Sequence, residues 1–153
     1  MSKQGDAAYA WFLKGYNCSQ SVVAAFAPQL GLTEETALRL SAGFGAGIGR
    51  MREVCGAFCG VVTVLSMVYA DPADPKDKSR IYALVQEAAE QYRSRNGGGS
   101  IICREILKNP PSDPAPTPRT AEFYKNRPCA RMVYCAAEIL DEYIAAHPLE
   151  NRT

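Results

Sequence analysis

The chain has 153 residues, 47 % hydrophobic and 22 % charged, and we expect one globular domain over residues 1–153. Lysine and arginine number 17 against 16 aspartate and glutamate. This near balance argues against a nucleic-acid-binding protein, because such proteins carry a clear excess of basic residues. Six cysteines stand against one histidine. Cysteine at about 4 % is below the roughly 8–10 % of a disulfide scaffold, so the thiols need another explanation.

The apolar residues recur mostly at helical spacing, and the alternation typical of strands is nearly absent. We therefore predict an all-α fold, a compact bundle of five to seven helices. Asn17 and Thr33 are expected to cap the second and third of them. In chain order, the helices are expected at residues 4–14, 18–30, 34–43, 52–70, 78–96, 102–108 and 128–146.

Two segments interrupt this helical pattern. Residues 43–49 carry glycine at every second position, which does not form a stable isolated helix. Such a run either lets two helices pack closely or lets the backbone approach Cys55. Residues 109–118 contain five prolines and are expected to form an extended surface loop.

The N-terminus has no apolar run of signal-peptide length, and Lys3 and Asp6 place charges within it. The apolar stretch 54–70 is short for a membrane span and contains polar residues, so we expect a buried core helix and no membrane insertion. These features favour a cytoplasmic location. In a reducing cytosol, cysteines stay free, bind metal or oxidise transiently.

Four cysteines fall at the predicted starts of helices. Unpaired backbone N–H groups and the positive end of the helix dipole favour a thiolate there. In favourable cases the thiol pKa falls from about 8.5 toward about 3.5–7.5. The alternative is that these cysteines are small apolar residues of the core. The four candidate site residues are Cys18, Cys55, Cys103 and Cys129, and the arginines near them in sequence are Arg50, Arg52, Arg104, Arg127 and Arg131.

The other two cysteines, Cys59 and Cys135, are expected to pack in the core. Cys55 and Cys59 are four residues apart on one helix face, where a disulfide would be strained. Cys135 lies six residues after Cys129, on another face of the last helix.

The cysteine-containing segments resemble a known family. Residues 54–60 read Val-Cys-Gly-Ala-Phe-Cys-Gly and contain Cys-Gly-Ala-x-x-Gly. Tyr16-Asn17-Cys18 precedes them, and segments around Cys103 and Cys129 follow. Over residues 8–143 the chain is similar to the small proteins named for their C_GCAxxG_C_C pattern. The matching cysteines are the same four that stand at predicted helix starts.

The resemblance implies that the protein is redox-active and has a redox partner, whose identity stays unknown. Members of the family are often encoded near transporter genes, so the resemblance also implies a link to a transport pathway. It also implies an iron–sulfur centre in a related domain of split-Soret cytochromes. The resemblance names neither a substrate nor an oligomeric state.

Three functions fit these observations. In the first, Cys18, Cys55, Cys103 and Cys129 carry out thiol–disulfide or electron-transfer chemistry; because the chain lacks a Cys-x-x-Cys motif, separate helices must then supply the pair. In the second, the same four thiolates bind an iron–sulfur cluster or zinc. In the third, the protein is a non-enzymatic helical binding module. The three differ in whether the protein is an enzyme at all.

Overall fold

The computed structural model describes residues 2–96 and 99–149, and these residues form eight α-helices and one 3₁₀ turn. The all-α fold is therefore confirmed, and in the described ranges the only extended pairing is an isolated bridge between Val54 and Ile102. In chain order the elements are α1 (Lys3–Leu13), α2 (Cys18–Leu30), α3 (Glu34–Ser41), η1 (Ala42–Phe44), α4 (Gly56–Tyr69), α5 (Lys78–Arg95), α6 (Cys103–Ile106), α7 (Ala121–Asn126) and α8 (Cys129–Ala146).

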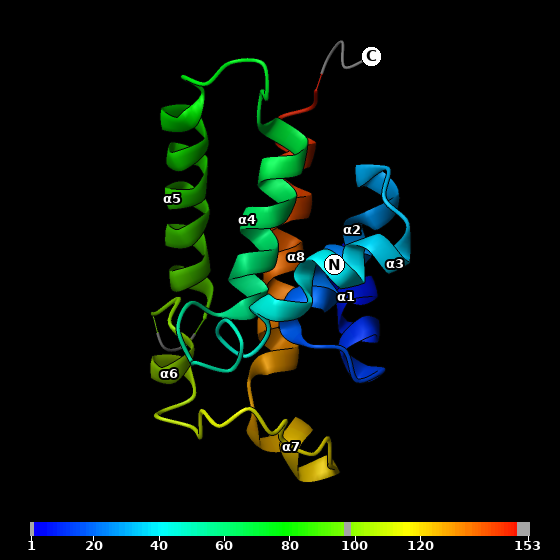
Figure 1. Ribbon diagram of the computed structural model, residues 1–153, viewed down its shortest axis with the longest axis vertical. Helices are drawn as coiled ribbons and strands as arrows, with labels where there is room; N and C mark the ends of the chain where they lie inside the picture. The colour runs from blue at the N-terminus through cyan, green and yellow to red at the C-terminus, as the bar shows by residue number, and fades with distance from the viewer. Residues whose placement is uncertain (1, 97–98, 150–153) are drawn as a thin grey trace.

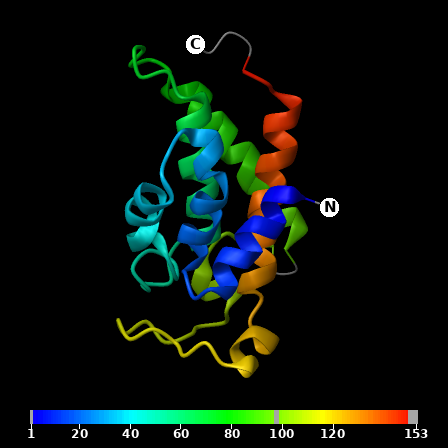
Figure 2. The same cartoon turned by 90° about the vertical axis from the view of Figure 1, so that its right-hand side faces the viewer.

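The long helices α4, α5 and α8 run along the length of the molecule, and α1, α2 and α3 cover one side of them (Figure 1). The short helices α6 and α7 lie near one end, where α4 and α8 begin. The chain that joins α6 to α7 crosses this same end (Figure 2). The starts of several helices are therefore gathered at one end of the bundle.

The core forms where α2, α4 and α8 meet. Their apolar faces bury Val22 and Phe26 from α2, Leu65 from α4, and Val133 and Leu140 from α8, each at most 2 % exposed. Burying such side chains contributes roughly 1.5–3 kcal/mol each, and this contribution fixes how the three helices pack. Within the described residues, no helix combines the length and apolar character needed to cross a membrane.

The helix starts agree closely with the sequence-based predictions. Asn17 caps α2 through a reciprocal pair of hydrogen bonds with Gln20, and the Thr33 hydroxyl accepts a hydrogen bond from the Thr36 backbone. Two helices differ from these predictions. The helix predicted from residue 52 begins at Gly56, because Arg52 is left-handed and Val54 pairs with Ile102 in the isolated bridge. The helix α7 was not predicted at all.

Gly60 allows α4 to approach α2. A Cβ atom at this position would lie 2.7 Å from the Cβ of Val22, which cannot move without shifting α2. We expect Gly60→Ala to lower the free energy of unfolding by about 1–2 kcal/mol, because overpacking outweighs the gain in helix propensity. Gly43→Ala is the control, since its Cβ would meet no atom within 4 Å. Denaturant unfolding measures both; equal stability of the two variants would contradict this account of the packing.

Candidate redox site

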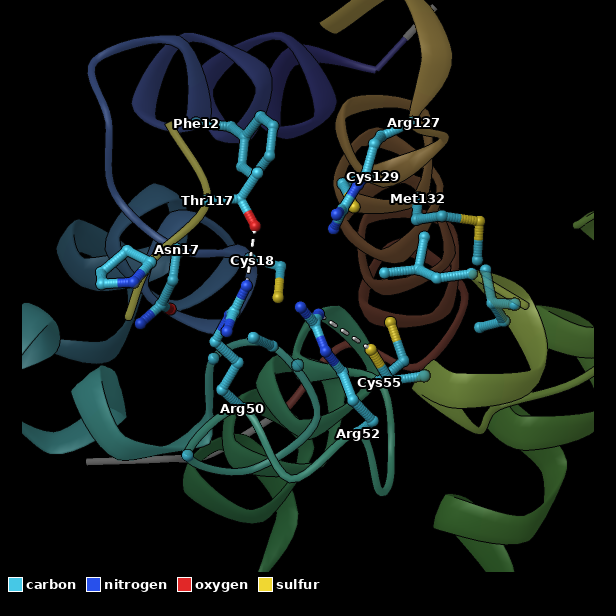
Figure 3. A pocket seen from close by; sticks show the side chains of 18 of the residues that line it. Phe12, Asn17, Cys18, Arg50, Arg52, Cys55, Thr117, Arg127, Cys129 and Met132 are labelled. Atoms are coloured by element: carbon cyan, nitrogen blue, oxygen red, sulfur yellow. Dashed lines mark hydrogen bonds between the residues drawn. The ribbon is translucent and has the colours of Figure 1, made fainter. Parts of the chain in front are cut away.

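All four cysteines predicted as site residues line one pocket with a volume of about 370 Å³. Each stands at the start of a helix: Cys18, Cys103 and Cys129 are the first residues of α2, α6 and α8, and Cys55 is the N-cap of α4. Figure 3 shows the Cys18, Cys55 and Cys129 side chains around this pocket. The fold thus brings together four thiols that are up to 111 residues apart in the sequence.

Cys55 and Cys103 are held near each other by backbone pairing. The Cys55 amide donates to the Ile101 carbonyl at 2.7 Å, and the Cys103 amide donates to the Glu53 carbonyl at 2.6 Å. Both bonds belong to the short antiparallel bridge between Val54 and Ile102. This bridge positions one cysteine at the start of α4 and the other at the start of α6.

Two glycines allow the backbone to lie directly against the thiols. A Cβ at Gly56 would overlap the Cys18 Sγ atom, and a Cβ at Gly47 would lie 2.6 Å from the Cβ of Cys103. Of the two roles considered for the glycine-rich run 43–49, the structure shows close backbone approach to the cysteines. For Gly47 the approach is to Cys103 rather than to Cys55.

The chain segment between η1 and α4, which lines one side of the pocket, has an unusual backbone. Five consecutive residues, 46–50, have φ between +55° and +75°, and Arg52 follows with φ of +62°. Glycine tolerates this region, but each other residue costs roughly 1–2 kcal/mol. Ile48 is β-branched and is a clear outlier at φ of +63°. Such strain persists when the surrounding structure holds it, and it is common at functional sites.

Residues 46–52, which we call the left-handed segment, carry two arginines that line the pocket. Arg52 is only 4 % exposed; its Nε donates to the Pro111 carbonyl at 2.9 Å, and its Nη1 lies 3.7 Å from the Cys103 Sγ. Arg50 pairs with Asp113 at 3.0 Å and donates to the Thr117 hydroxyl at 2.9 Å. Both arginines therefore tie the site to the proline-rich segment.

That proline-rich segment is part of the site and not only a connector. It has no helix or strand between Leu107 and Thr120, and Pro114, Pro116 and Thr117 line the pocket. Arg119 fixes its far end by donating to the carbonyls of Phe12 and Tyr16, both at 2.9 Å. The sequence predicted an extended loop here but gave no sign that it closes one side of a pocket.

Tyr92 is a site residue that the sequence did not reveal. It comes from α5, is fully buried, and its hydroxyl lies 3.2 Å from the Cys55 Sγ. A buried hydroxyl without a partner is costly, so this contact satisfies the phenol and orients Cys55. The two residues are 37 positions apart, and no motif links them.

The prediction that the helix starts lower the thiol pKa is wrong for three of the four cysteines. Burial raises the pKa of Cys18 and of Cys55, although backbone hydrogen bonds act in the opposite direction. Burial also raises the pKa of Cys129 to about 12, against the opposing effect of Arg127. Loss of hydration, together with mutual repulsion of the clustered thiolates, outweighs the helix ends and the arginines.

Cys59 and Cys135 lie outside this pocket. Cys59 is buried in α4, and Cys135 packs, half-buried, against the main core. Burial raises the pKa of each to about 11. His147 caps the far end of α8 and stacks on Tyr143. The four cysteines predicted as site residues line the pocket, and Cys59 and Cys135 do not.

All six cysteines are free thiols. Among residues 2–96 and 99–149, no three side chains of histidine, cysteine, aspartate or glutamate converge closely enough to hold one metal ion. The four thiols thus surround a cavity without meeting at a point. This arrangement does not form the tetrahedral four-thiolate site that a single zinc ion requires.

The comparison with protein families agrees with the sequence pattern. The family described as "Putative redox-active protein (C_GCAxxG_C_C)" matches residues 16–143. The match covers more than half of the chain, and the chain belongs to this family. No curated protein and no solved structure matches the chain.

Burial makes a pH-dependent reactivity testable in the reduced, metal-free protein. Because the pKa of Cys129 is about 12, its thiol is protonated at neutral pH, and the thiolate fraction rises about tenfold per pH unit. We expect the alkylation rate of Cys129, followed by mass spectrometry, to rise steadily from pH 7 to pH 10. In denaturant the rate should level off near the ordinary thiol pKa of about 8.5. A folded protein with an inflection below pH 8 would contradict this.

Proposed function

We propose that Cys18, Cys55, Cys103 and Cys129 bind an iron–sulfur cluster and that the protein transfers electrons through it. The observation that carries this proposal is that four thiols surround one cavity without converging on a point. A cluster of the four-iron, four-sulfur type would suit such a cavity because each of its cysteine ligands binds a different iron atom. A single metal ion would instead need ligands that converge.

The surroundings of the thiols also fit this group. Four soft sulfur donors are the ligand set that iron–sulfur clusters use in proteins. The guanidinium of Arg52 faces Cys103, and four helix starts meet at the pocket, so positive charge is available to stabilise bound thiolates. Gly56 leaves room beside the Cys18 sulfur, which a Cβ would fill. When bound, the cluster would supply one-electron chemistry.

The protein's own residues have separate tasks in this proposal. The bridge between Val54 and Ile102 keeps Cys55 and Cys103 at the same end of the cavity. The proline-rich segment, held by Arg50 and Arg52, excludes water from one side. The Tyr92 hydroxyl lies 3.2 Å from the Cys55 sulfur and would donate to it once Cys55 is a bound thiolate, which orients that ligand. Exclusion of water and hydrogen bonds to sulfur are the means by which a protein sets the potential of such a centre.

The second candidate is thiol–disulfide exchange by the same cysteines. Cys18 and Cys129 are partly exposed, whereas Cys55 and Cys103 are buried, so a disulfide substrate would reach the first two. The raised pKa of Cys18 and of Cys129 disfavours the attacking thiolate at neutral pH. Partial exposure favours exchange, and the four-sided cavity favours the cluster.

Anaerobic reconstitution with iron and sulfide separates the two candidates. We expect a broad visible absorbance band that bleaches on reduction, and stoichiometric iron and sulfide in the desalted protein. Serine at any one of positions 18, 55, 103 or 129 should lower the retained iron by more than half. Cys59→Ser and Cys135→Ser are matched controls and should retain iron as the native protein does. Protein that stays colourless and iron-free, with a reversible disulfide among the four cysteines, would overturn the cluster proposal.

Tyr92→Phe tests the hydrogen bond to Cys55 in the reconstituted protein. Phenylalanine fills the same buried space but cannot donate to sulfur. A hydrogen bond to a sulfur ligand stabilises the reduced, more negative state, so its loss should lower the midpoint potential by tens of millivolts. Tyr82→Phe is the control, because Tyr82 lies on the same helix and is 59 % exposed. Equal potentials in the two variants would exclude a tuning role for Tyr92.

A further inference from the structure

The pocket concentrates positive charge. Four arginines line it, and none of the described residues that line it is acidic. The whole chain has a net charge of only +1, so this is a local excess. Of the four, only Arg50 has a carboxylate partner in the described ranges, the exposed Asp113. The arginines concerned are Arg50, Arg52, Arg119 and Arg127.

Arg52, Arg119 and Arg127 have no carboxylate partner among the described residues. Arg119 is held by two backbone carbonyls, which leaves Arg52 and Arg127 as the groups available to a ligand. Arg52 is 4 % exposed, and its contacts are a backbone carbonyl and the Cys103 sulfur. Arg127 is partly exposed and lies over the Phe123 ring at 5.3 Å; in the part of the chain that the structure describes, its guanidinium makes no hydrogen bond or ion pair. A charge so buried as that of Arg52 is costly unless an anion meets it.

The two groups face a shared space. Figure 3 shows the guanidinium ends of Arg52 and Arg127 turned into the pocket, which Cys18 also lines. We infer that the pocket binds a small dianion through Arg52 and Arg127, next to the Cys18 and Cys129 thiols. Cys18, Cys129 and Arg127 are all partly exposed, so this is the side from which a ligand enters.

The chemical class of the ligand follows from the donors. A guanidinium offers a planar fork of N–H groups that matches the paired oxygens of carboxylate, phosphate and sulfur oxyanions. Phe12, Pro116 and Met132 give the same pocket apolar walls that accommodate a short carbon skeleton. The assignment of this anion as the redox substrate rests on the proposed function, whereas its binding does not.

Calorimetric titration of the full-length, reduced protein tests the inference, at constant ionic strength balanced with sodium chloride. The probes are sodium sulfate, an inorganic dianion, and sodium succinate, a dicarboxylate with a carbon skeleton. We expect at least one of them to bind saturably at one site. Tighter binding of sulfate would indicate an inorganic oxyanion, and tighter binding of succinate an organic acid. Binding of neither probe above the chloride background would overturn the inference.

Variants assign the binding to the pocket. Arg127→Gln should weaken it about tenfold to a hundredfold, the effect of losing a charge-assisted hydrogen bond, and Arg127→Lys should weaken it less. Arg131→Gln is the matched control, since it removes the same charge a short way along the chain, in α8 and outside this pocket. Equal weakening by Arg127→Gln and Arg131→Gln would overturn the inference.

Iron analysis of the same preparations after anaerobic reconstitution keeps the two proposals separate. Protein that assembles a cluster but binds neither dianion contradicts only the anion site. Protein that binds a dianion at Arg127 but retains no iron contradicts only the cluster.

Discussion

The guanidinium of Arg52 is buried where the left-handed segment, the start of α6 and the proline-rich segment meet. Its side chain holds the Pro111 carbonyl and lies against the Cys103 sulfur, and its backbone carbonyl accepts from the Arg104 amide. One residue thus joins three segments that have little regular structure of their own. The cost of burying its charge is offset only if the site itself supplies negative charge, as bound thiolates or an anion would.

The pocket lies at the end of the bundle because the helices that supply its cysteines begin there. Helices α2, α4 and α8 pack through a shared buried core, and their starts present Cys18, Cys55 and Cys129 to the pocket. The fourth cysteine needs a separate support, which the bridge between Val54 and Ile102 supplies. The bundle gives the site its geometry, and the irregular segments give it charge and cover.

The sequence predicted the helices well because capping and apolar spacing are local signals. Asn17 and Thr33 cap the helices that they were expected to cap, and the four cysteines stand at the expected starts. The sequence did not reveal α7, which has only six residues and buries none of them. It also did not reveal Tyr92, whose contact with Cys55 depends on the packing of α5 against α4.

The predicted direction of the pKa shift is wrong for the thiols of Cys18, Cys55 and Cys129, and the reason is physical. A helix start and a nearby arginine are visible in the sequence, but burial is a property of the tertiary structure. Cys129 shows the conflict directly, since Arg127 lowers its pKa while burial raises it to about 12. Likewise, the alternating glycines indicated that residues 43–49 do not form an ordinary helix, but they did not predict the left-handed backbone.

In the proposed function, four thiols from four helix starts act as one ligand set. X-ray absorption at the iron edge of the anaerobically reconstituted protein reports on this ligand set. We expect a first shell of sulfur alone together with iron–iron scattering, and loss of this signal when Cys18 is replaced by serine. Nitrogen or oxygen ligands in the native protein, or a signal that survives Cys18→Ser unchanged, would contradict it.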